Sequence, residues 1–198
     1  SSNEWYRSKH LPSLRHVPDL SYNISNIVAA VYGKTKKALV LDLDNTLWGG
    51  ILGEDGCHGV KIGHEYPGSI YYSFQLSLQR LKNSGVILCL VTKNNESDID
   101  EIFRNRDMPL SIDDFVAVKA NWGLKSENIS ALLGWLNISS SSALFIDDNP
   151  FEIEEVGRVH TDMECLKFNV NQFDDVNNVL SDLSDLYAHY LTDEDKVK

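Results

Sequence analysis

Cysteine is scarce in this chain of 198 residues. The three that are present are Cys57, Cys89 and Cys165, and no two of them form a C-x-x-C pair. A disulfide framework uses paired cysteines, and a zinc site uses closely spaced cysteine or histidine ligands. The cysteine content therefore argues against both and favours a reducing compartment.

Long apolar runs and an excess of basic residues are missing too. The longest clean apolar run, 86–91, is far shorter than the roughly 20 residues that span a bilayer. The first ten residues are polar and charged, unlike a signal peptide, and we expect a cytoplasmic protein. Lys and Arg number 18 against 29 Asp and Glu, a formal net charge of −11. Because phosphate backbones and anionic lipids would repel such a chain, we expect neither nucleic acid nor membrane as a partner.

The two ends of the chain differ in pattern from its middle. Residues 1–35 carry scattered aromatics and no steady period, and we expect an N-terminal arm or the remnant of an upstream domain. Residues 36–170 alternate regularly and form the expected catalytic core. Residues 171–198 are rich in acids and predict a solvated helix or tail.

Short apolar runs alternate with amphipathic segments along the core. The apolar runs predict buried strands over 38–43, 86–91, 115–120 and 143–147. Helices are expected over 69–85, 96–105, 125–137 and 151–160. Strands alternating with helices predict right-handed crossovers and an α/β fold, a three-layer doubly wound parallel sheet.

Polar residues gather where the predicted strands end. Asp42 and Asp44 close the first run, Thr92 follows the second, and Asp147 with Asp148 ends the fourth. In an open α/β sheet, ligands bind outside the carboxyl ends of the strands. The sequence therefore predicts a site at this edge of the sheet.

The two acid pairs predict a metal site. Asp42 and Asp44 share strand parity, so both can face one crevice, where two carboxylates repel each other. A divalent cation removes that conflict, and oxygen ligands suit Mg²⁺, with Asp147 and Asp148 completing the cage. Any one of these acids alone is more often a turn or helix-cap residue. Both pairs together favour the metal.

Thr92 and Lys125 supply the remaining parts of a phosphoryl-transfer site. Alone, Thr92 is more often a helix cap, and Lys125 a solvated lysine. Lys125 nevertheless opens a helix, where a cation is unfavourable unless it holds an anion. Lys93, beside Thr92, is a further candidate phosphate ligand. With the acids, these residues offer a nucleophile, a proton carrier, phosphate ligands and a metal, the parts of transfer through an aspartyl phosphate.

The order of these motifs resembles the haloacid dehalogenase (HAD) superfamily. A response-regulator receiver has similar parts in another order, whereas D-x-D in "DLDNTLWGG", then Thr, Lys and Asp-Asp, is similar to the HAD arrangement over 36–170. The resemblance implies Asp42 as nucleophile and Asp44 as general acid/base. It also implies Thr92 and Lys125 on the phosphoryl oxygens. Mg²⁺ would be held by the Asp42 carboxylate, the Asp44 carbonyl and Asp148, with Asp147 beside it.

A finer resemblance is to the FkbH-like branch, subfamily IIIC. It rests on "DLDNTLWGGILGEDG", "TKNNE", "NWGLKSENI" and "FIDDNPFE". Members of that branch take the glyceryl unit of 1,3-bisphosphoglycerate, remove phosphate and load the acyl group on an acyl carrier protein in polyketide biosynthesis. Related sequences often carry a cysteine where this chain has Val91. Cys57, on the expected flap, is the nearest substitute as an acyl-bearing thiol.

Spacing predicts a capless core with an open site. Only about 25 residues separate Asp44 from the next helix, enough for a short flap and too few for a cap domain. Trp48 and Trp122 are either walls of the crevice or packing residues. Two other functions stay open: a stand-alone phosphatase for a small phosphometabolite or phosphoprotein, and a non-catalytic interaction module with a vestigial site.

Overall fold

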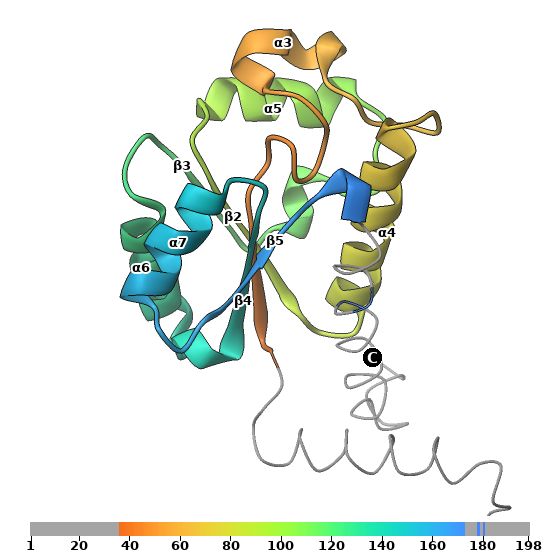
Figure 1. Cartoon of the computed structure of the whole chain (residues 1–198). Helices are drawn as coiled ribbons and strands as arrows, with labels where there is room; N and C mark the ends of the chain where they lie inside the picture. Colours follow the sequence, from red (N-terminus) through yellow and green to blue (C-terminus); the bar gives the residue numbers. More distant parts are fainter. Residues whose placement is uncertain (1–35, 173–177, 179, 181–198) are drawn as a thin grey trace, which may run out of the picture.

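The computed structural model describes residues 36–172, 178 and 180 (Figure 1). The expected N-terminal arm, 1–35, lies outside the described residues, as does most of the acidic segment 171–198. Among the described helices, none combines the length and the apolar character that a membrane crossing requires.

A five-stranded parallel sheet forms the centre of the fold, in the order β3-β2-β1-β4-β5. Its strands are β1 (Ala38–Leu41), β2 (Ile87–Thr92), β3 (Ala117–Ala120), β4 (Ala143–Asp147) and β5 (Glu164–Lys167). In the middle, Leu41 of β1 pairs with Leu90 of β2 and with Ile146 of β4. From β1 the chain adds β2 and β3 on one side of β1, and it then adds β4 and β5 on the other side. The switch point therefore lies at the carboxyl end of β1, where α/β folds bind ligands.

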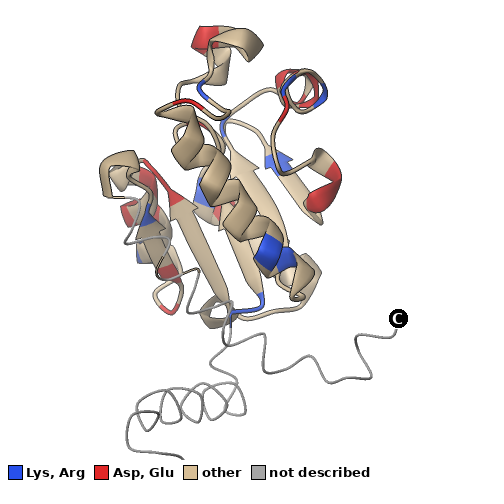
Figure 2. Cartoon of the chain, turned by 90° about the vertical axis from the view of Figure 1, so that its right-hand side faces the viewer, with Lys and Arg blue, Asp and Glu red and all other residues tan. Residues whose placement is uncertain are grey.

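Helices cover both faces of the sheet, as the alternation predicts. They are α4 (Gly68–Asn83), α5 (Glu96–Asn105), α6 (Lys125–Leu136) and α7 (Pro150–Val159). Figure 1 shows α6 and α7 on one face and α4 on the other. In Figure 2 the strands are mostly uncharged, and the charged residues lie on helices, loops and strand ends. The predicted three-layer α/β fold is confirmed.

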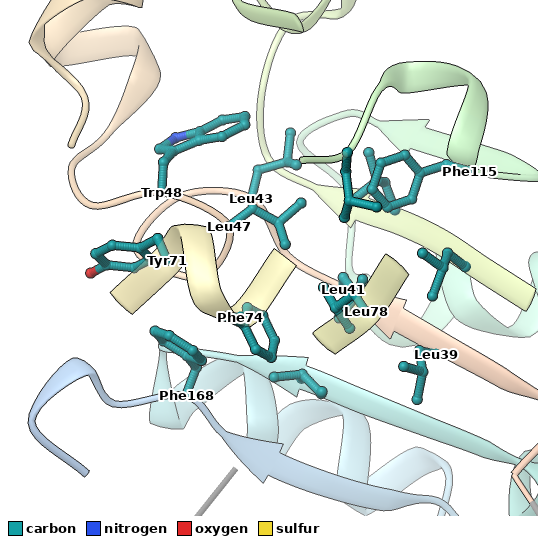
Figure 3. Close-up of a cluster of buried hydrophobic side chains, with 14 of the residues drawn as sticks. Leu39, Leu41, Leu43, Leu47, Trp48, Tyr71, Phe74, Leu78, Phe115 and Phe168 are labelled. Atoms are coloured by element: carbon teal, nitrogen blue, oxygen red, sulfur yellow. The ribbon is translucent and has the colours of Figure 1, made fainter. Parts of the chain in front are cut away.

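Two apolar cores explain why the central strands read as continuous apolar runs. In β1, Leu39 and Leu41 pack in the larger core with Phe74 and Leu78 of α4 (Figure 3). The alternate residues of β1 join the second core, which includes Ile129 of α6. Because both faces of β1 are covered, all four of its residues are buried.

The segment between β1 and α4 is a short flap and contains a helix that the sequence did not predict, α3 (Leu52–Gly59). Figure 1 shows α3 beside α5. Arg106, at the end of α5, donates to three flap carbonyls, those of Cys57, His58 and Ile62, at 3.4, 3.3 and 3.1 Å. The predicted short flap without a cap domain is confirmed for the described residues, and Arg106 fastens it to the core.

Candidate active site

A pocket of about 370 Å³ opens at the carboxyl ends of β1, β2 and β4. Every residue predicted as a catalytic, metal or phosphate ligand lines it: Asp42, Asp44, Thr92, Lys93, Lys125, Asp147 and Asp148. The parallel sheet brings them together because it places the ends of separate strands at one edge. Four separate motifs thus form one site.

Lys125 bridges two buried carboxylates inside this pocket. Its Nζ lies 2.8 Å from Asp42 Oδ1 and 2.6 Å from Asp147 Oδ2, and the residue is only 3% exposed. Lys125 is also the first residue of α6, where the helix dipole disfavours a cation. The two carboxylates offset this unfavourable interaction with the helix dipole. Lys125 therefore belongs to the site and not to the solvated surface.

The single positive charge of Lys125 does not balance the negative charges of the carboxylates of the site. Burial raises the pKa of Asp42 to about 6; Lys125 opposes this rise and Asp147 adds to it. Burial also raises the pKa of Asp147 and of Asp148. Burial alone would lower the pKa of Lys125, but Asp42 and Asp147 stabilise its cation and raise it overall. One lysine does not balance the two buried acids, Asp42 and Asp147, and the half-buried Asp148.

The donor set fits a hard divalent cation. Carboxylate oxygens of Asp42, Asp147 and Asp148 lie within 4.8 Å of one another. Asp147 already accepts from Lys125 Nζ through Oδ2 and from the Asn149 N–H, at 2.8 Å, through Oδ1. Asp42 and Asp148 are therefore the carboxylates best placed to hold Mg²⁺, which prefers oxygen ligands.

Asp44 lies outside this carboxylate group in the described structure and is held by three donors. Trp48 Nε1 and the Leu52 N–H donate to its Oδ1, each at 3.0 Å. Asn94 Nδ2 donates to its Oδ2 at 2.9 Å. Trp48 is fully buried and supports Asp44 from the core, so it is not an exposed wall of the crevice. Trp122 is 72% exposed and, in the described part of the chain, does not line the pocket.

Two site residues were missed at the level of sequence. Asn94, only 5% exposed, connects Asp44 with Thr92 Oγ1, to which it donates at 3.0 Å. Its position two residues after Thr92, just beyond the carboxyl end of β2, is the signal that could have found it. Glu152, in the first turn of α7, pairs with Lys93 Nζ at 2.6 Å, and both line the pocket. Lys93 is thus already paired with an acid.

The cysteines lie away from the reaction centre. Cys57 is in α3, 8% exposed, and is not among the described residues that line the pocket. This position gives no support to its role as an acyl-bearing thiol. Cys89 is buried in β2, and burial raises its thiol pKa to about 11. Cys89 is therefore a core residue.

The chain matches no protein-family model and no curated protein. Among solved structures, it is 37% identical to the N-terminal part of the protein BF1531 from Bacteroides fragilis, which contains a phosphatase domain and is complexed with Mg. The TM-score is 0.72, and the match covers 94% of this chain and 49% of that one. This chain therefore spans about half the length of that structure.

A second solved structure shares the fold at low identity. It is the HAD-family enzyme bt-2542 from Bacteroides thetaiotaomicron, in a magnesium complex, with 12% identity and a TM-score of 0.51. That match covers 70% of this chain and 96% of the other. The chain is thus similar in sequence to a structure that contains a phosphatase domain, and it shares its fold with a HAD-family enzyme.

Proposed function

We propose that the chain is a Mg²⁺-dependent phosphatase or phosphotransferase that works through an aspartyl phosphate. The observation that carries the proposal is the convergence of Asp42, Thr92, Lys125 and Asp148 on one pocket. The phosphatase domain and Mg of the B. fragilis structure support it. A phosphorylated small molecule is the expected substrate.

The proposed chemistry divides between Asp42 and Asp44. A carboxylate oxygen of Asp42 attacks phosphorus, forming a new P–O bond, while the bond to the leaving oxygen breaks and Asp44 gives that oxygen a proton. Asp44 then takes a proton from water, which attacks the aspartyl phosphate and releases phosphate. A divalent cation on Asp42 and Asp148, when bound, supplies charge that keeps Asp42 ionised and neutralises phosphoryl oxygens.

Thr92 and Lys125 are the proposed ligands of the phosphoryl oxygens. Both are at most 3% exposed yet line the pocket. A hydroxyl and an ammonium held in a buried site stabilise developing negative charge without reorganising. Lys93 is the third candidate, although Glu152 now pairs with it.

Replacing Asp42 by Asn tests the mechanism. Asp42→Asn removes the nucleophile with little change in shape, and we expect phosphate release from an acyl phosphate to fall about a thousandfold or more. Asp100→Asn, in an exposed pair with Arg104 on α5, is the matched control and should keep full activity. Phosphate release by Asp42→Asn at the rate of the unaltered protein would rule out the aspartyl-phosphate mechanism.

At the finer level we propose the FkbH-like reaction on 1,3-bisphosphoglycerate. Asp42 removes the phosphate ester at carbon 3, and the thiol of an acyl carrier protein attacks the carbonyl at carbon 1, so that the glyceryl thioester forms as the acyl phosphate gives up its phosphate. The resemblance of the four motif segments supports this reading, as does an open site without a cap. A carrier protein incubated with the enzyme, Mg²⁺ and 1,3-bisphosphoglycerate should gain the mass of a glyceryl group.

A cytoplasmic location stays a prediction.

One observation favours the alternative of a stand-alone phosphatase. Among the described residues, no cysteine lines the pocket, so no thiol is available there to carry an acyl group. Phosphate release without any mass gain on the carrier protein would select this alternative. If the folded protein neither binds Mg²⁺ in calorimetry nor releases phosphate, the third alternative, an interaction module with a vestigial site, takes the place of both enzymes.

A further inference from the structure

We infer that Asn94 and Trp48 are positioning residues that decide which oxygen of Asp44 moves the proton and which way the Thr92 hydroxyl points. The inference rests on the proposed phosphoryl transfer and extends it to residues with no part in the chemistry assigned so far. It is carried by four hydrogen bonds that join the half-buried Asp44 and the buried Thr92 to their neighbours.

The two oxygens of Asp44 are not equivalent. Oδ1 accepts two hydrogen bonds, from Trp48 Nε1 and from the Leu52 N–H, each at 3.0 Å. Because a carboxylate oxygen offers about two lone-pair positions, Oδ1 has none left for a proton. Oδ2 accepts only from Asn94 Nδ2, at 2.9 Å, among the hydrogen bonds of the described residues. Oδ2 therefore keeps a lone pair for proton transfer.

Asn94 also sets the hydroxyl of Thr92. Its Nδ2 has two hydrogens, one directed to Asp44 Oδ2 and the other, at 3.0 Å, to Thr92 Oγ1. Turning the amide over would aim its oxygen at the Asp44 carboxylate, which is repulsive, so only this orientation suits an ionised Asp44. Since Thr92 Oγ1 accepts from Asn94, its own hydrogen is free to donate to a phosphoryl oxygen in the pocket that Thr92 lines.

Trp48 holds Asp44 from the apolar side. The indole N–H can only donate, so it keeps Oδ1 in the role of acceptor. Trp48 is fully buried and packs edge-on against Phe103 of α5, with ring centroids 6.0 Å apart. Figure 3 shows it beside Leu43 and Leu47 in the larger core. This packing holds the indole N–H in place beside Asp44.

The inference predicts an effect that depends on the leaving group. A phenolate leaving group needs the proton of Asp44. The more stable p-nitrophenolate needs that proton much less. We expect Trp48→Phe and Asn94→Leu to lower kcat/KM, which reports the step in which the leaving group departs, about tenfold to a hundredfold more on phenyl phosphate than on p-nitrophenyl phosphate. Asn94→Leu should also raise KM, because it releases the Thr92 hydroxyl, whereas Trp48→Phe should leave KM unchanged.

A matched control separates positioning from general damage. Phe103→Leu loosens the packing around Trp48 but keeps the indole N–H, so it should change the rate on both esters by the same factor. If Trp48→Phe and Asn94→Leu also slow both esters equally, their role is structural and the inference fails. If the unaltered protein releases phosphate from neither ester, the proposed function fails on these substrates instead.

A measurement without turnover tests the same contacts. The indole N–H resonance that disappears in Trp48→Phe belongs to Trp48, and we expect it to shift in Asp44→Asn, where its acceptor loses charge. The resonance should keep its position in Asp100→Asn, because the exposed carboxylate of Asp100 pairs with Arg104 and not with the indole. An unchanged Trp48 resonance in Asp44→Asn would show that the hydrogen bond to Asp44 is absent and would overturn the inference.

Discussion

Lys125, at the start of α6, lies 2.8 Å from Asp42, which follows β1. We expect Lys125→Met to reduce phosphate release at least a hundredfold, because the phosphoryl oxygens lose their cation. The free energy of unfolding should fall by about 3–5 kcal/mol in metal-free buffer, since the change leaves the buried carboxylates of Asp42 and Asp147 without their cation. Urea titrations with and without Mg²⁺ check this, and Mg²⁺ should recover part of the loss. Lys61→Met, on the exposed flap, should change neither quantity; a Lys125→Met protein as stable as the control contradicts the prediction.

The buried acids predict a pH dependence for the metal-free protein. Burial raises the pKa of Asp42 from 3.8 to about 6, so between these values the folded state binds more protons than the unfolded chain. The contribution of Asp42 to stability is therefore full below about pH 3.8 and is lost as the pH rises through about 6. Asp147 and Asp148 have raised pKa values too and act in the same direction. Urea denaturation in EDTA should show a smaller decline with pH for Asp42→Asn.

The pair of Lys93 and Glu152 predicts a gain in substrate binding. Glu152→Gln removes a negative charge from the pocket and frees Lys93, which Glu152 now holds at 2.6 Å. We expect KM for a phosphorylated substrate to fall a few-fold, the size that a partly exposed charge pair allows, with little change in kcat. Glu154→Gln is the matched control, because Glu154 forms an exposed pair with Arg158 on the same helix. Equal effects of the two changes on KM would argue against a specific role of Lys93.

The hydrogen bonds of Arg106 predict that this residue holds the flap on the core. Arg106→Met removes donors to three flap carbonyls, so we expect faster hydrogen–deuterium exchange in α3 and a higher KM. Arg104→Met, which breaks only an exposed pair on α5, should leave exchange in α3 as it is. If α3 exchanges at the same rate in both variants, the flap is held by its apolar contacts alone.

Replacing Gln75 should lower the free energy of unfolding without changing the proposed phosphoryl-transfer chemistry. It is fully buried in α4, donates to the Leu47 carbonyl at 2.8 Å and accepts from the Leu110 N–H at 3.2 Å. Gln75→Leu leaves both backbone groups unpaired and should cost about 1–3 kcal/mol of unfolding free energy. Gln79→Leu, which removes one bond to the Pro109 carbonyl at a half-buried position, should cost less because water can replace it. Urea denaturation of both variants checks the order.

The sequence alone determined the parts of the fold that depend on local pattern. The apolar run over 38–43 predicted a strand covered on both faces, and the helical segments between such runs predicted a parallel sheet. Those two facts bring Asp42, Thr92 and Asp147 to one edge. β5 could not be read in the same way, because its outer residues Glu164 and Lys167 are exposed and leave no apolar run.

The tertiary structure alone decided what each side chain meets. Lys125 has the local features of a surface lysine until β1 and β4 supply Asp42 and Asp147 beside it. Trp48 could equally line a crevice until the packing of α5 buries it and turns its indole N–H to Asp44. Periodicity records which face of an element is covered, whereas a contact between distant elements depends on how both faces pack. Hydrogen bonds such as that of Asn94 to Asp44 therefore exist only once the sheet is assembled.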